Sequence, residues 1–162
     1  MARLVLTDAS PLIGLARVDG LPWLGALFSV VWMPPEVRRE VLPLRGLPDE
    51  EAIRAAEAAG WLKQTDPAPD GLVLPDLDEG EAACIRSALS SAGPCLLLMD
   101  ERAGRAIARE HGLAVAGTAA VIGMAKTRGL IASAGDVFRR LQGSDFRITT
   151  QVIETVLRRV GE

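Results

Sequence analysis

The sequence predicts an α/β fold, a three-layer α/β/α sandwich around a central, mostly parallel sheet of four to five strands. Short, continuously apolar runs alternate with helical patterns along the chain. Strands of this kind are typical of parallel sheets that helices cover on both faces. The chain has 162 residues, of which 49% are hydrophobic. Because a domain has on the order of 150 residues, we expect a single domain over residues 1–162.

Five short runs are candidate strands. RLVLT ends directly before Asp8, and CLLLM ends directly before Asp100. The run at residues 61–65 is expected to form a short edge strand. In chain order, the candidate strands cover residues 3–7, 29–33, 61–65, 95–99 and 113–116.

Helical patterns lie between and after these strands. Ser10 is a good N-cap and Pro11 suits the first helical position, so the first helix is expected at residues 11–17. A helix is also expected at residues 79–90, directly after a proline-rich surface loop at residues 66–78. The other expected helices cover residues 21–28, 34–42, 49–59, 101–111, 118–127, 136–142 and 151–160.

The composition excludes several classes of protein. Lys and Arg number 18 against 21 Asp and Glu, a net charge of −3, so any contact with nucleic acid must come from a local basic patch. No apolar run approaches the roughly 20 residues of a membrane helix, and the first residues do not resemble a signal peptide. Cys84 and Cys95 are too few and too far apart for a zinc cluster or a redox pair. We therefore expect a cytoplasmic protein without membrane contact, with both cysteines as small core residues.

Motifs for nucleophilic catalysis and nucleotide binding are missing. His111 is the only histidine and has no evident serine or cysteine partner, which argues against a catalytic triad. In GTAAVIGMAKT, residues 117–127, the lysine does not follow the second glycine as a P-loop requires. No GxGxxG is present, so a Rossmann-type nucleotide site lacks support.

Two aspartates follow strands of the expected sheet. Asp8 comes after the first strand and Asp100 after CLLLM, at the sheet edge where open α/β sheets bind ligands. If the two strands are neighbours, the carboxylates converge. Each residue also has a structural explanation that the sequence leaves open. Asp8 could bond nearby backbone N–H groups in a turn, and Asp100 could be the N-cap of the next helix.

Topology places Glu81 near Asp100. The short turn SAGP joins the helix at residues 79–90 to the strand that Asp100 follows, so helix and strand run antiparallel. The first turn of the helix therefore lies at the carboxyl end of that strand. The alternative is a start that resembles a capping box, with Asp78 as the N-cap and Glu81 three residues later.

Spacing alone does not place Glu40 near these residues. It lies about two turns into its helix, roughly 9 Å along the axis, and Glu36 is one turn earlier on the same face. The pattern therefore predicts a solvated surface glutamate.

Converging carboxylates indicate a cation site. Several of them cannot stay ionised together without a counter-ion, so either their pKa values rise or a cation binds. Oxygen ligands without Cys or His select Mg²⁺ or Mn²⁺. Such ions activate water and neutralise the charge that develops on a phosphodiester, so the pattern favours hydrolysis of nucleic acid.

Four segments together resemble a PIN domain, in particular the bacterial and archaeal branch described as predicted nucleic-acid-binding proteins containing a PIN domain. Similarity to VapC-type toxins is more general. The segments cover most of the chain in the family's order. They are DASPLIGLA at 8–16, MPPEVRREVL at 33–42, LDEGEAACI at 77–85 and LLLMDERAGRAIAREHGLAVAGTAAVIGMAKTRGLI at 97–131.

The resemblance implies a metal-dependent ribonuclease site with Mg²⁺ or Mn²⁺ as cofactor. Ser10 matches the hydroxyl residue that supports the first aspartate, and Glu101 is an auxiliary candidate beside the fourth acid. Glu40 enters the set through the resemblance alone. The third position is often aspartate in the wider family, and the longer glutamate here affects metal geometry or occupancy. The four acidic positions are matched, in order, by Asp8, Glu40, Glu81 and Asp100.

Arg102, Arg105 and Arg109 recur at helical spacing and are candidates for phosphate contacts. Their alternative is a solvated helix face on which Glu101 pairs with Arg105. The resemblance further implies RNA as substrate, products with 5′-phosphate and 3′-hydroxyl ends, a small antitoxin partner and a homodimer. The competing hypothesis is a non-catalytic PIN-like module that binds nucleic acid or protein, and the four retained acids argue against it.

Overall fold

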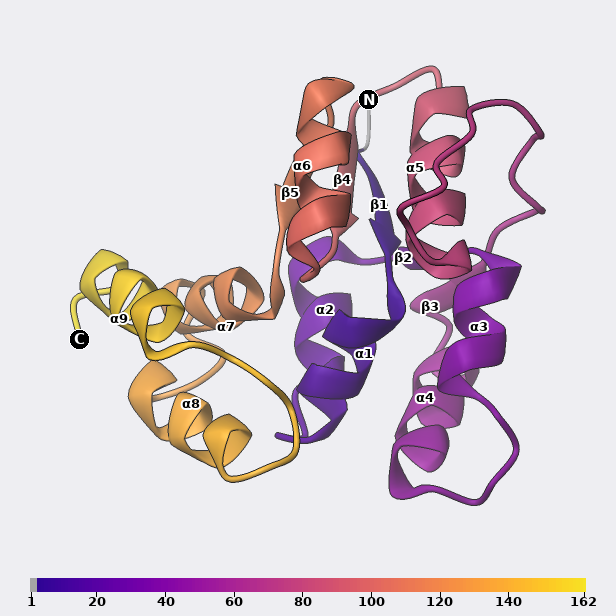
Figure 1. Ribbon diagram of the computed structural model, residues 1–162. Coiled ribbons are helices and arrows are strands. Elements are labelled where there is room, and N and C mark those ends of the chain that lie inside the picture. The colour runs from indigo at the N-terminus through magenta and orange to yellow at the C-terminus, as the bar shows by residue number, and fades with distance from the viewer. Residues whose placement is uncertain (1–2) are drawn as a thin grey trace.

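The computed structural model describes residues 3–162. Its centre is a sheet of five parallel strands in the order β3-β2-β1-β4-β5 (Figure 1). The prediction of a mostly parallel sheet of four to five strands is confirmed, and β3 forms an edge as expected. The strands are β1 (Leu4–Thr7), β2 (Val31–Met33), β3 (Leu62–Gln64), β4 (Cys95–Leu98) and β5 (Ala114–Ala116).

Helices cover both faces of this sheet, which gives the expected three layers. From β1, the chain moves in one direction across the sheet to β2 and then β3. Through the connections that contain α5 and α6, it moves in the opposite direction to β4 and then β5. Right-handed crossovers therefore place the two sets of helices on opposite faces. No helix within residues 3–162 is long and apolar enough to cross a membrane. The helices are α1 (Ala9–Ala16), α2 (Leu21–Phe28), α3 (Pro35–Val41), α4 (Pro48–Ala58), α5 (Glu79–Ser90), α6 (Arg102–Glu110), α7 (Thr118–Thr127), α8 (Ala134–Gln142) and α9 (Thr150–Arg159).

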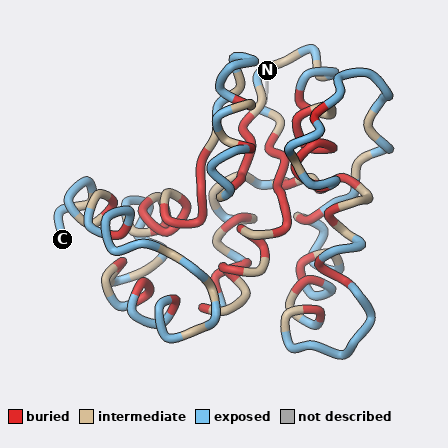
Figure 2. Tube along the Cα trace, viewed as in Figure 1, coloured by how far each residue is buried: buried red, intermediate tan, exposed pale blue. Residues whose placement is uncertain are grey.

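The two central strands are buried from both sides. Leu6 in β1 and Leu97 and Leu98 in β4 are 0% exposed, and Figure 2 shows buried residues running along the strands. Successive strand residues point to opposite faces, so consecutive buried leucines require cover on both faces. Because helices cover both faces of the sheet, a ligand can reach these central strands at their ends.

The first helix begins two residues earlier than predicted. Asp8 stands at the N-cap position with extended backbone, at ψ 175°, and α1 starts at Ala9. The prediction that Ser10 caps this helix was wrong. Pro11 is tolerated in the first turn because the N–H groups there have no acceptor within the helix. Asp8 is thus the single residue between strand and helix, which holds its side chain at the end of the sheet.

The proline-rich loop at residues 66–78 is attached to α5. Leu74 is only 9% exposed, and Arg86 Nε donates a hydrogen bond to the Leu72 carbonyl at 2.8 Å. The loop ends at Asp78, whose Oδ1 accepts a hydrogen bond from the Glu81 N–H at 2.8 Å as the N-cap of α5. The position of the first turn of α5 is fixed by these contacts.

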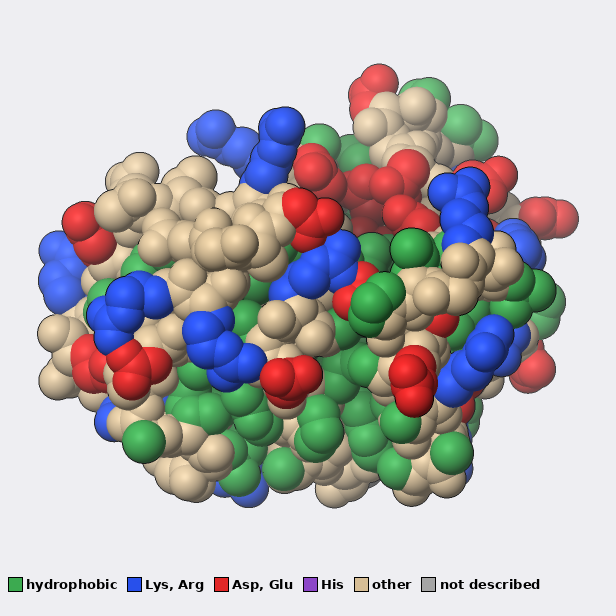
Figure 3. Space-filling model, turned by 90° about the horizontal axis from the view of Figure 1, so that it is seen from below, with side chains coloured by type: hydrophobic (Ala, Val, Ile, Leu, Met, Phe, Trp, Pro, Cys, Tyr) green, Lys and Arg blue, Asp and Glu red, His purple; other side chains and the backbone are tan. Residues whose placement is uncertain are grey.

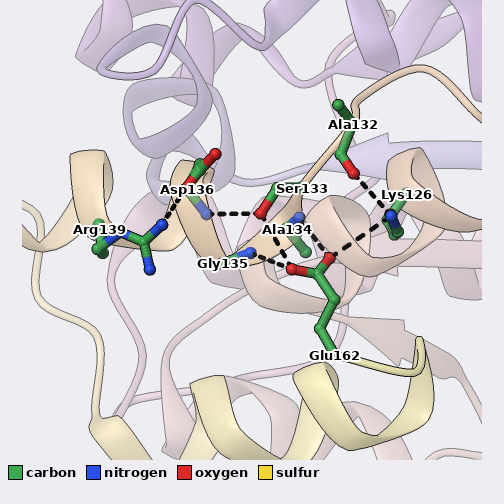
Figure 4. A network of polar contacts seen from close by, with 8 residues as sticks. All are labelled: Lys126, Ala132, Ser133, Ala134, Gly135, Asp136, Arg139 and Glu162. Carbon is green, nitrogen blue, oxygen red and sulfur yellow. Dashed lines mark hydrogen bonds and ion pairs between the residues drawn. The ribbon is translucent and has the colours of Figure 1, made fainter.

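Glu162 connects the C-terminal helices (Figure 4). Its carboxylate accepts hydrogen bonds from Ser133 Oγ at 3.0 Å and from the N–H groups of Ala134 and Gly135 at 2.7 and 3.1 Å. Lys126 Nζ lies 3.8 Å from the same carboxylate. These bonds lower the pKa of Glu162, the Ala134 N–H contributing most. They also give acceptors to N–H groups at the start of α8 that have none within the helix.

Candidate functional site

The end of β1 and the end of β4 meet at one edge of the sheet. Thr7 pairs with Leu98, and the Asp8 N–H donates to the Leu98 carbonyl at 2.9 Å. The two strands are therefore neighbours, as the convergence of Asp8 and Asp100 requires. Asp8 is 4% exposed, and Asp100 is partly buried. Both carboxylates thus lie at the edge that the sequence indicated.

Glu81 lies against α6 and near Asp8, whose charge contributes to the raised pKa of Glu81. It is 5% exposed, and a methyl group placed on Gly104 of α6 would overlap Glu81 Oε2 and the Met99 sulfur. Glycine at this position lets α6 approach the carboxyl group closely. Asp78 is the N-cap, as the capping alternative proposed, and Glu81 Oε2 is buried beside Gly104 and Met99.

The structure confirms the predicted surface position of Glu40, and it also places the Glu40 carboxyl group near Asp8, which the spacing along the helix did not indicate. Gly80 lies between them, because a Cβ there would be 2.9 Å from Asp8 Oδ1 and 3.5 Å from Glu40 Oε2. Glu40 itself is exposed. Helix α3 packs against α5, and this packing brings the end of α3 to the start of α5.

Asp100 is held by the first residue of α7. Its Oδ1 accepts from the Thr118 N–H at 2.8 Å, and its Oδ2 accepts from Thr118 Oγ1 at 2.7 Å. Thr118 is 0% exposed. The alternative in which Asp100 caps the following helix is therefore wrong, and Glu101 holds that N-cap position without a side-chain bond. Asp100 instead has a fixed orientation beside the end of β4.

Arg105 lies next to Asp100. Its Nη1 donates to the Met99 carbonyl at 3.0 Å, and a Cβ on Gly117 would be 3.0 Å from Nη1 and 2.8 Å from Asp100 Oδ1. The alternative pairing of Arg105 with Glu101 is absent from the ion pairs found within residues 3–162. Arg105 therefore supports the end of β4 and partly offsets the charge of Asp100.

The remaining sequence candidates are less closely tied to the cluster. For the part of the chain that the structure describes, no hydrogen bond joins Ser10 to Asp8, so the expected support by its hydroxyl is not seen. Glu101, Arg102 and Arg109 are exposed on α6. Arg102 stands at the first position of this helix, near the carboxylates and open to solvent.

Burial raises the pKa of all four carboxyl groups. The pKa of Asp8 rises from 3.8 to about 7, mainly through burial and further through the charges of Asp78, Glu40 and Asp100, while an Ala9 N–H bond opposes the change. Burial and then Asp78 raise the pKa of Glu81 to about 8. The pKa values of Glu40 and Asp100 are also raised, chiefly by burial. Asp8 and Glu81, the two buried groups, are therefore costly to ionise without a cation.

The donor chemistry of the cluster fits a hard divalent cation. Asp8 Oδ1 and Glu81 Oε2 are buried and have no hydrogen-bond partner, although buried carboxylate oxygens usually have one. Figure 3 shows acidic side chains gathered around a hollow, with Lys and Arg on the same face. Across residues 3–162, no three Asp, Glu, His or Cys side chains are placed to hold a metal ion as they stand. Since like charges repel, a cation would have to draw the carboxylates together.

Comparison of the chain with known protein families and structures shows to which family it belongs. A family model described as a PIN domain matches residues 4–162. The chain belongs to the PIN-domain family. No curated protein and no solved structure matches it. The resemblance that the four sequence segments indicated is thus confirmed at the level of the family.

A PIN domain has a nuclease-like fold, and divalent metals are its general cofactors. The carboxylate cluster of this PIN domain lies at the carboxyl ends of β1 and β4. Thr118 and Gly80 were not among the candidate site residues predicted from the sequence. Only Gly117 separates Thr118 from the end of β5, so the rule that located Asp8 and Asp100 could also have found it.

Proposed function

We propose that this PIN-domain protein is a Mg²⁺- or Mn²⁺-dependent endoribonuclease that cleaves single-stranded or structured RNA. Asp8, Glu40, Glu81 and Asp100 would hold the ions. The Asp8 carboxylate carries the proposal, because it is 4% exposed and its Oδ1 has no hydrogen-bond partner. A buried and unpaired carboxylate is costly, and a bound cation would remove that cost.

When bound, such an ion supplies an activated water and neutralises charge on the scissile phosphate. The chain's own residues fix the surroundings. The Leu98 carbonyl holds the Asp8 backbone, and Thr118 orients both oxygens of Asp100. We predict products with 5′-phosphate and 3′-hydroxyl ends.

Arginines on α6 support binding of a phosphate backbone. Arg102 is free in solvent at the start of the helix. Arg105 uses one N–H on the Met99 carbonyl and retains others, because a guanidinium has five N–H donors. Glu101 is exposed beside them and serves as an auxiliary acid. The basic side chains would contact phosphates, and the carboxylates would contact the ions.

The second candidate is a non-catalytic module that binds nucleic acid or protein. One observation favours it: within residues 3–162 the acidic side chains do not form a ready metal site. The two candidates differ in what Mg²⁺ does to stability. An ion that binds only the folded state adds about 2.7 kcal/mol to the free energy of unfolding at 100 times its Kd. A module without a metal site would show no such increase.

Cleavage of a labelled single-stranded RNA pool tests the proposal. The wild type should cleave with Mn²⁺ or Mg²⁺ and not with chelator, and Asp8→Asn and Asp100→Asn should each abolish cleavage. Asp76→Asn is the matched control, because Asp76 is exposed in the loop before α5 and should cleave normally. Undiminished cleavage by Asp8→Asn would refute the assignment. If nothing is cleaved, a metal-dependent rise in melting temperature that Asp8→Asn lacks would favour an unidentified substrate over the binding module.

The toxin role, the antitoxin and the homodimer rest on the sequence resemblance, and we retain them as proposals. A VapC-type toxin should arrest bacterial growth when expressed in the cytoplasm, and its Asp8→Asn variant should not. Light scattering after size exclusion measures whether the chain is a dimer. Growth arrest by Asp8→Asn equal to that of the wild type would contradict the toxin role.

A further inference from the structure

Asp78 has a carboxylate at the edge of the cluster. Its Oδ1 accepts the hydrogen bond from the Glu81 N–H that begins α5, at 2.8 Å. The cap uses this one oxygen. Unlike Asp8, the residue is exposed, so its carboxylate can reach a group that enters from solvent.

The helical turn that Asp78 begins contacts two carboxylates of the proposed site. Gly80 is its second helical residue, and a Cβ there would meet Asp8 Oδ1 at 2.9 Å and Glu40 Oε2 at 3.5 Å. The positive end of a helix favours anions at this position. The charge of Asp78 also contributes, after burial, to the raised pKa values of Asp8, Glu40 and Glu81. Asp78 therefore lies near these three carboxyl groups.

Asp8 gives an independent sign that a cation belongs here. It is 4% exposed, and Oδ1, the oxygen beside Gly80, has no hydrogen-bond partner. The unpaired oxygen of Glu81 lies against Gly104 and Met99 instead. Asp78 is therefore the additional carboxylate at the start of α5 on the side of the cluster that holds Asp8 and Glu40.

We propose that Asp78 is a metal-binding residue as well as a helix cap, and that it binds a hard divalent cation together with Asp8 and Glu40. This inference rests on the proposed function and adds a fifth carboxylate to the four of the sequence analysis. One oxygen would remain on the Glu81 N–H while the other contacts the ion. Carboxylates bind such ions through one or both oxygens.

Two substitutions separate capping from metal binding. Ser and Asn are both good N-caps, so Asp78→Ser and Asp78→Asn keep the helix start and remove the carboxylate. The probe is Mn²⁺ alone, without RNA, and bound ion is measured by electron paramagnetic resonance or calorimetry. We expect both variants to weaken Mn²⁺ binding roughly tenfold or more, since even outer-shell partners contribute 10–100-fold. Asp76→Asn should bind as the wild type does, and Asp8→Asn should not bind.

The outcomes distinguish this inference from the proposed function. If both Asp78 variants bind Mn²⁺ like the wild type while Asp8→Asn does not, Asp78 is only a cap, and the proposed function stands. A third variant, Asp78→Ala, removes both the carboxylate and the cap. If Asp78→Ala weakens binding while Asp78→Ser and Asp78→Asn do not, the effect comes from the lost cap and the inference is again overturned. If the wild type binds no Mn²⁺, both proposals fail. Far-ultraviolet circular dichroism of the metal-free variants checks that α5 is retained.

Discussion

Replacing Asp8 with Asn should stabilise the metal-free protein at neutral and alkaline pH. The pKa of Asp8 is raised from 3.8 to about 7 by burial and neighbouring carboxylates. The folded state therefore holds this proton more tightly than the unfolded state, so stability falls as pH rises from about 4 to about 7. Three pH units correspond to about 4 kcal/mol at about 1.36 kcal/mol per unit. A buried amide needs partners of its own, at a cost of about 1–3 kcal/mol if unpaired, so we expect a net gain of roughly 1–4 kcal/mol.

Urea unfolding in chelator at pH 4.5 and pH 8 measures this difference. Asp8→Asn should be more stable than the wild type at pH 8, and the gain should shrink toward pH 4.5, where the wild-type carboxyl is protonated in the folded state. Mg²⁺ should then stabilise the wild type and leave Asp8→Asn unchanged. Asp76→Asn controls for the loss of one negative charge. A variant that is less stable than the wild type at pH 8, or equally changed at both pH values, would refute the reasoning.

Three further predictions concern the surroundings of the site and the C-terminal helices. Thr118→Val should lower the free energy of unfolding by about 1.5–3 kcal/mol, the typical contribution of a hydrogen bond to a charged group. A double-mutant cycle with Asp100→Asn should show strong coupling between the two residues. Additive effects of the two substitutions would contradict the contact. Mn²⁺ affinity should rise between pH 6 and pH 9, because Asp8 and Glu81 have pKa values of about 7 and about 8 and must lose their protons to bind; calorimetry that shows a constant affinity would refute this. Glu162→Gln should lower the melting temperature at pH 7, and because the folded pKa of Glu162 is lowered, the difference should disappear as pH falls through that pKa.

Local patterns predicted the sheet well because each strand is a short apolar run with its own boundaries. The apolar runs directly before Asp8 and Asp100 form β1 and β4. These two strands pair with each other, as the convergence of the two aspartates requires. Glu81 could be placed because the short SAGP turn makes its helix run antiparallel to the strand that Asp100 follows. These inferences depend on residues close together in the chain.

Two features depended on contacts that spacing does not contain. Glu40 reaches Asp8 because α3 packs against α5, and its position along α3 alone predicted a surface residue. Ser10 was assigned a capping role from residue type, whereas the end of β1 put Asp8 at that boundary. In both cases, tertiary packing decided the outcome.

The central position of β1 affects how the chain folds during synthesis. Of the five described strands, β1 is made before the others, yet its neighbours are β2 and β4. Because β1 ends at Thr7 and β4 ends at Leu98, about 90 further residues must be made before both edges of β1 can be paired. At about 5–20 residues per second, this delay is roughly 5–20 s. Asp100 and the Thr118 that orients it arrive later still, so a partly made chain contains Asp8 without the partners of its site. Activity of the proposed kind therefore cannot begin on an incomplete chain.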